Sequence, residues 1–118
     1  MPIEVPYQLI AKGFTEALGR NPSPTELVVN QQSLQVGGCR DAVVGPWMTM
    51  LLDGPEARSL PLTNRQRVQA AYRLLLNRDP DNAGWNYYES LPFPTAIAQI
   101  RKAPEYRANI FKICNNRA

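Results

Sequence analysis

The stretch VQAAYRLLLNRDPDNAGWNYY, from Val68 to Tyr88, decides the fold that we expect of this chain. From Val68 onward, apolar residues recur at the i, i+3, i+4 and i+7 positions, a spacing that lays one apolar stripe along a helix. Residues 78–81 then end that helix, because proline lacks an amide hydrogen and disfavours helical geometry in the residue before it. Asp81 is placed to cap a second helix that turns Trp85 and Tyr88 inward. The stretch therefore predicts two helices joined by a tight turn.

A longer motif surrounds this stretch. It combines a tyrosine-arginine pair, a leucine pair, an arginine-aspartate-proline-aspartate turn, a glycine, two aromatic positions and a glutamate-tyrosine-arginine ending. The residues that carry it are Tyr72, Arg73, Leu75, Leu76, Arg78, Asp79, Pro80, Asp81, Gly84, Trp85, Tyr88, Glu105, Tyr106 and Arg107. This motif resembles family 4214 of the bacterial domains of unknown function and, more weakly, the linker domains of phycobilisomes, the cyanobacterial light-harvesting antennae.

The resemblance covers about the last half of the chain. It implies a small all-helical module that is usually part of larger bacterial surface or secreted proteins and has no established catalytic residues.

The first half of the chain repeats the motif more loosely. Phe14 and Arg20 lie 58 positions before Tyr72 and Arg78, and both segments end in a proline-containing turn. Self-similarity at a fixed offset is typical of internal repeats. We therefore predict one all-α domain over residues 1–118, a compact helical domain built from two divergent helical repeats at about 7–58 and 63–114. The core that we expect consists of Phe14, Leu18, Leu27, Trp47, Leu51, Val68, Tyr72, Leu75, Leu76, Trp85, Ile97, Ile100, Tyr106 and Ile110.

Helix starts support this division. Ser23 and Glu26 form a capping-box sequence, and Ser23 lies 58 positions before Asp81. Towards the ends of the repeats the offset falls to 49, so the first copy carries nine extra residues within the glycine-rich segment 35–45. That segment is either a feature particular to this protein or a permissive loop. Residues 1–6, which contain two prolines, are expected to form an extended arm that frays or docks on a neighbour.

Composition bounds the function. The chain has no histidine, which excludes a histidine-dependent catalytic triad and a histidine zinc site. We find no catalytic constellation and expect no cofactor and no metal. No apolar run reaches the roughly 18 residues that cross a bilayer, and the first residues lack a signal-peptide pattern. We therefore expect a soluble protein without membrane insertion. The sequence does not determine its compartment, and a virion or an extracellular assembly is among the candidates.

Charge and cysteines are unevenly distributed. Residues 1–60 hold four basic and six acidic residues, for a net charge of −2, whereas residues 61–118 hold nine and four, for +5. This asymmetry fits a head-to-tail contact between copies, although a solvated helical surface is the simpler interpretation. Cys39 and Cys114 lack a nearby partner of the Cys-x-x-Cys type, so we expect two separate reduced thiols, with one disulfide as the alternative.

Several side chains have both a structural and a functional interpretation. We interpret one group as helix punctuation and core rather than as a ligand site: Arg20, Ser23, Glu26, Tyr72, Arg78, Asp79, Asp81, Trp85 and Tyr106. Residues 79–84 begin like a calcium loop, but Ser90 stands where a bidentate glutamate is required, so helix capping is the preferred interpretation.

A possible interaction surface consists of Arg65, Arg73 and Tyr87. Nucleic-acid binding is not expected, because the basic residues do not line one helix face cleanly and the net charge of the chain is only +3. We expect a non-enzymatic structural or adaptor subunit that binds other protein subunits, or copies of itself, in a larger assembly such as a bacterial surface layer or a phage particle. The alternative is a carbohydrate-binding module that uses the exposed ring of Tyr87 and polar groups near it.

Overall fold

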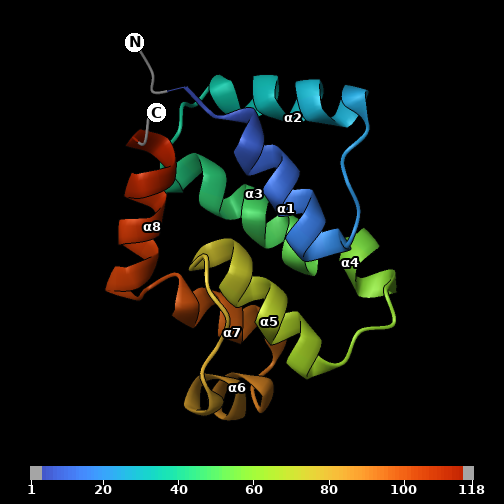
Figure 1. The fold of residues 1–118 in the computed structure, drawn as a ribbon, viewed down its shortest axis with the longest axis vertical. Coiled ribbons are helices and arrows are strands. Elements are labelled where there is room, and N and C mark those ends of the chain that lie inside the picture. The colour runs from blue at the N-terminus through green and yellow to red at the C-terminus, as the bar shows by residue number, and fades with distance from the viewer. Residues whose placement is uncertain (1–3, 116–118) are drawn as a thin grey trace.

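The computed structural model describes residues 4–115, and all regular structure in that range is helical (Figure 1). The predicted all-α fold is therefore confirmed. The helices are α1 (Tyr7–Leu18), α2 (Pro24–Gln35), α3 (Asp41–Asp53), α4 (Pro55–Ser59), α5 (Asn64–Leu75), α6 (Asn82–Glu89), α7 (Phe93–Ile100) and α8 (Pro104–Asn115).

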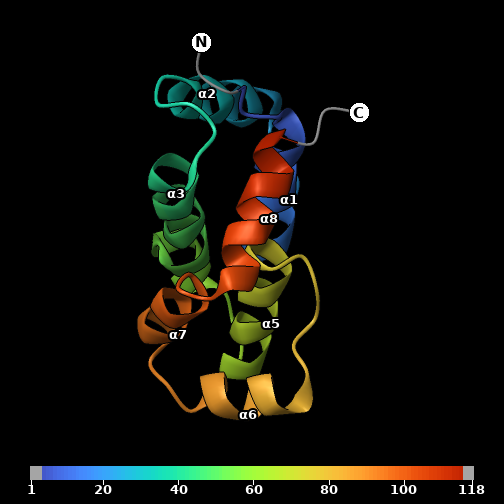
Figure 2. The same cartoon turned by 90° about the vertical axis from the view of Figure 1, so that its left-hand side faces the viewer.

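Helices α1 and α5 pack against each other at the centre of the fold. Helix α1 also packs against α2 and α3, and α5 packs against α6 and α7. Figures 1 and 2 show α2 lying across one end of the molecule and α6 across the opposite end. Helix α8 returns toward the end that carries α2, so the last helix closes the fold against its first half.

The ends of the helices follow from local chemistry. Ser23 and Glu26 hydrogen-bond each other's backbone amides at the start of α2, and Thr63 does the same with Gln66 at the start of α5. Such capping boxes satisfy amides that would otherwise lack a partner. Helix α1 ends at Gly19, which adopts a left-handed conformation with φ of 68°. Asn77, 58 positions later, has φ of 57° and is the one non-glycine residue of the described chain with a positive φ.

The core lies where α1, α3, α5, α7 and α8 meet. Most of the predicted core residues are buried, and so are Val5, Ile10, Val44, Met48 and Leu74. Leu27, Trp47, Leu51 and Trp85 are instead only partly buried, at the edge of the core. For Trp85 the reason is the position of α6, which crosses the end of the fold and contains no fully buried residue.

The amino-terminal arm docks on its own chain. Val5 is fully buried, its amide donates to Oε1 of Gln35, and its carbonyl accepts from Nε2 of Gln31 at 2.9 Å. The backbone at Val5 is extended and belongs to no helix, so these two side chains supply the hydrogen-bond partners of its amide and carbonyl groups. The arm therefore neither frays nor reaches a neighbour at residues 4–6, and residues 1–3 lie outside the described range.

The glycine-rich segment 35–45 is mostly helix rather than loop. Helix α3 begins at Asp41, so the connection from α2 is only residues 36–40. A Cβ atom at Gly45 would lie 2.3 Å from Nη2 of Arg101 and 2.4 Å from Oδ1 of Asp41, so these two side-chain ends pack directly against the helix there. Residues 41–45 thus belong to α3, and Gly45 leaves room there for the side chain of Arg101.

A disulfide joins Cys39, just before α3, to Cys114 near the end of α8, with the Cα atoms 5.4 Å apart. The expectation of two reduced thiols is wrong. Cysteine spacing gave no indication of the pairing, because α8 brings together residues that are 75 positions apart. Both cysteines are buried, at 3% and 5% relative exposure.

Candidate functional site

Arg20 and Arg78 form matching ion pairs at the ends of matching helices. Arg20 donates to both carboxylate oxygens of Glu56 at 2.8 and 3.0 Å, and Arg78 donates to both oxygens of Glu105 at 2.5 and 2.9 Å. Bidentate pairs of this kind fix geometry as well as adding energy. They tie α1 to α4 and the end of α5 to α8, which is a structural task.

The surroundings of the two arginines also match. The Arg20 guanidinium lies 5.1 Å from the centroid of the Phe14 ring, and the Arg78 guanidinium lies 5.2 Å from that of Tyr72. Each arginine also donates to the carbonyl of the residue that follows it. The guanidinium of Arg20, followed by the backbone amide of Ser23, lowers the pKa of Glu26 to about 2.

Asp79 and Asp81 serve the turn between α5 and α6. Asp79 accepts from Nε of Arg73 at 2.6 Å, and Asp81 caps α6 by accepting from the amide of Gly84 at 2.7 Å. The hydrogen bond from Arg73, followed by one from Gln69, lowers the pKa of Asp79. Both carboxylates of the calcium-like segment are thus used by neighbouring groups of the chain.

Tyr106 is fully buried in a polar cluster that joins α3, α7 and α8. Its hydroxyl donates to Oδ1 of Asp41, and Arg101 donates to the same oxygen at 3.2 Å and to Oγ1 of Thr49 at 3.3 Å. Burial, followed by the Asp41 carboxylate, raises the pKa of Tyr106. The cluster joins α3 in the first half of the chain to α8 in the second half.

The residues of the predicted interaction surface do not form one patch. Arg65 lies 4.3 Å from the centroid of the Trp85 ring and pairs with Glu89 at 3.6 Å. Tyr87 is 52% exposed on α6, and its hydroxyl donates to Oε1 of Gln99 at 2.9 Å. Arg73 lies eight residues beyond Arg65 along α5, about 12 Å away at the rise of a helix. It lines a different feature of the molecule.

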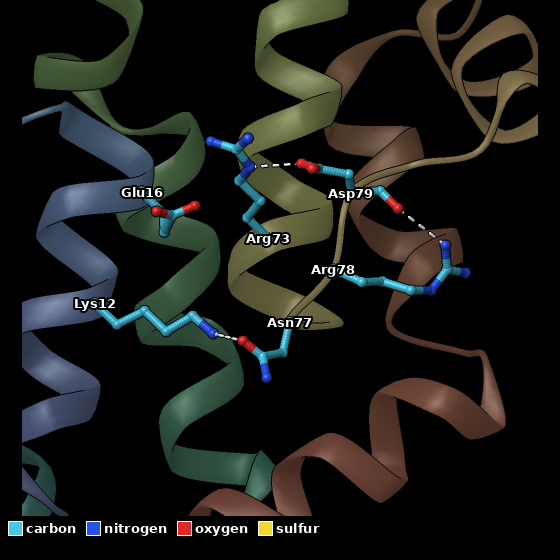
Figure 3. A pocket seen from close by; sticks show the side chains of 6 residues that line it. All are labelled: Lys12, Glu16, Arg73, Asn77, Arg78 and Asp79. Carbon is cyan, nitrogen blue, oxygen red and sulfur yellow. Dashed lines mark hydrogen bonds and ion pairs between the residues drawn. The ribbon is translucent and has the colours of Figure 1, made fainter.

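That feature is an open cavity of about 230 Å³ between α1 and the end of α5 (Figure 3). Its lining consists of Lys12, Glu16, Arg73, Asn77, Arg78 and Asp79. The sequence analysis had singled out Arg73, Arg78 and Asp79. It did not indicate Lys12, Glu16 or Asn77. These residues come together only because α1 packs on α5, a contact between segments that are distant in the sequence. Only that long-range pairing could have identified them.

A second surface feature is the outer face of α2. Val28, Val29 and Val36 are 41%, 55% and 87% exposed. Residues 27–39 contain no charged side chain, although 19% of the chain is charged. Helix α2 packs mainly on α1, and its buried side chains are Gln31 and Leu34. The side of α2 that faces away from α1 thus carries exposed valines and no charge.

Within the described residues, no helix is both long and apolar enough to span a bilayer. Comparison of the chain with protein-family models, with curated proteins and with solved structures finds no match. The resemblance to family 4214 and the internal repeat therefore stay predictions.

Proposed function

We propose that this protein is a non-enzymatic structural subunit of a larger assembly and that the outer face of α2 binds a second copy of the chain. The observation that supports the proposal is the uncharged, valine-bearing surface of that helix. Valine is a weak helix former, so the exposed Val28 and Val29 in α2 and Val36 at its C-cap gain little from propensity or from burial within the monomer.

The α2 face shares one property with the core of a protein interface, which is the lack of charged residues. The buried centre of a protein interface is depleted in charged residues compared with the rest of a protein surface. Val29 and Val36 are seven positions apart and thus lie on one side of the helix, where Gln32 and Ser33 are the exposed residues between them.

A second copy is the partner that this surface fits. In a two-fold symmetric dimer the same patch meets itself, and a charged patch would repel its copy. The α2 face carries no charge to cause such repulsion. The observations favour this assignment over carbohydrate binding, because Arg65 covers a face of Trp85 and the Tyr87 hydroxyl is engaged by Gln99.

The disulfide supports an oxidising compartment as the place of assembly. Disulfides persist in secreted, periplasmic and surface proteins, whereas the cytosol of most organisms keeps thiols reduced. A buried bond between Cys39 and Cys114 is consistent with the surface or extracellular setting that we propose.

The proposal is tested by measuring the mass of the protein in solution by light scattering over a range of concentrations. We expect a dimer for the wild-type chain and a monomer for the double variant Val29→Asp, Val36→Asp. Phe111→Asp is the matched control, because it places the same charge at another exposed apolar residue, on α8, at 69% exposure. A wild-type chain that stays monomeric at every concentration, or a dimer that survives the α2 variant, would refute the proposal.

A further inference from the structure

The cavity between α1 and α5 has cationic groups that the fold does not fully use (Figure 3). Arg78 is held by Glu105, and Nε of Arg73 is held by Asp79. The ammonium of Lys12 instead donates to Oδ1 of Asn77, a neutral amide. Within residues 4–115, neither Nη1 nor Nη2 of Arg73 has a hydrogen-bond partner. The cavity thus offers donors from two cations on opposite walls.

The other half of the chain shows that the fold does not require these charges. At the offset of 58 positions, Arg73 corresponds to Thr15 and Asp79 to Asn21. Thr15 donates to Asn21 at 3.4 Å, so a side-chain contact of the same kind exists there between neutral groups. The residues that correspond to Lys12 and Glu16 are Ala70 and Leu74.

Asn77 gives the same indication. Its counterpart is Gly19, which has the same left-handed backbone and no atom within 4 Å of a Cβ position. Glycine adopts this conformation without steric cost, whereas asparagine only tolerates it. The chain thus places a side chain where none is needed for the turn, and that side chain contacts Lys12. Arg78 alone of the lining has an identical counterpart, Arg20, and both pair with a glutamate.

We propose that this cavity binds the carboxylate group of a small organic acid between the ammonium of Lys12 and the terminal nitrogens of Arg73. The planar fork of an arginine matches a carboxylate, and an ammonium on the opposite wall completes the site. The lining carries three cations and two anions, but Glu105 neutralises Arg78 from outside it, so the remaining charges balance and a monoanion suits the site better than a dianion. A cavity of about 150 Å³ is enough for benzene, so about 230 Å³ accommodates a small acid.

The electrostatic setting of Lys12 supports this assignment. Burial lowers the pKa of Lys12, Glu16 raises it in part, and Lys112 lowers it again. A bound carboxylate would supply a countercharge to this partly desolvated ammonium. The site is independent of the α2 face, so either proposal can fail without the other.

The test is an NMR titration with N-acetylglycine, which has one carboxylate and no ammonium. We expect saturable shifts at the side-chain amide of Asn77 and the Nε–H of Arg73. The double variant Lys12→Ala, Arg73→Thr takes its residues from the matching positions of the other half. We expect its dissociation constant to rise by about 2- to 25-fold, since each of the two exposed ion pairs contributes up to about fivefold. Lys102→Ala removes one charge at an exposed residue outside the lining and should leave binding unchanged.

The wild-type titration decides the proposal even if the double variant fails to fold. Shifts that do not saturate, or that occur away from the cavity, would overturn it. Inorganic phosphate that binds more tightly than N-acetylglycine at equal ionic strength would overturn the assignment of a carboxylate. The same loss of binding free energy for each removed charge in the Lys102→Ala control and in the double variant would show that only net charge matters, and would also overturn it.

Discussion

Removing the disulfide should destabilise the protein strongly. The change is Cys39→Ala with Cys114→Ala, at two buried positions 75 residues apart. In the chain-entropy treatment, closing a loop of this length removes about 15 cal/mol/K from the unfolded chain, or about 4.5 kcal/mol at 25 °C. Removing a native disulfide from a small domain usually lowers the free energy of unfolding by about 2–5 kcal/mol. Because the free energy of unfolding of native proteins is about 5–15 kcal/mol, the variant should retain only a small part of its stability.

Urea unfolding followed by circular dichroism measures this loss. The double variant should unfold at a clearly lower urea concentration than the oxidised wild type, and reductant should lower the midpoint of the wild type without affecting the variant. Two outcomes would refute the reasoning. One is the labelling of two thiols per chain in denatured, unreduced wild type, which would mean that the bond does not form. The other is an unchanged midpoint in the double variant.

Two further changes test the packing and the electrostatics. Gly13→Ala should destabilise the fold, because its Cβ would lie 2.6 Å from the Trp47 ring and 2.8 Å from Leu51. Such overpacking costs about 1–3 kcal/mol, more than the roughly 1 kcal/mol that alanine gains in helix propensity. A urea midpoint equal to or above that of the wild type would contradict this. The pKa of Glu26 should be about 2 in a carboxyl NMR titration and should move toward 4.5 in Arg20→Met. Since the folded pKa lies below the unfolded one, stability from this pair should be present above about pH 4.5 and be lost as the pH falls toward 2. A Glu26 pKa that is the same in both proteins would show that Arg20 is not its cause.

Local patterns were sufficient to predict the fold class and the starts of α2 and α6. The capping boxes at Ser23 and Thr63 and the aspartate cap at Asp81 depend on residues within one turn of each other, so the sequence contains the whole signal. The burial of Trp85 was overestimated for a related reason. Helical spacing indicates which face of α6 turns inward, but not that α6 lies across the end of the fold.

Long-range contacts could not be predicted in this way. The disulfide, the docking of Val5 on α2 and the cavity each join segments that are distant in the sequence. Arg20 and Arg78 were recognised as structural because their surroundings repeat at one offset. Lys12 and Asn77 lack such a counterpart, so no sequence pattern pointed to them, and for the same reason they are candidates for a function of their own.

The ion pairs of the folded chain also determine how copies could associate. The sequence suggested that an acidic first half could attract a basic second half. In the structure, the acidic groups of the first half are largely engaged within the chain: Glu26 and Glu56 by Arg20, Asp53 by Arg58, and Asp41 by Arg101.

Among residues 4–60, the charged groups outside these ion pairs are Glu4, Glu16, Lys12 and Arg40, whose charges sum to zero. Arg20 pairs with two glutamates, so one negative charge remains in that cluster. The positive excess of the second half, which includes Lys102, Arg107 and Lys112, therefore meets an acidic excess of only one charge in the ion pairs of another copy. Association through the uncharged α2 face should for this reason persist at high salt, where exposed ion pairs are screened. A dimer that dissociates as salt is raised would instead show that charged surfaces, and not α2, hold the copies together.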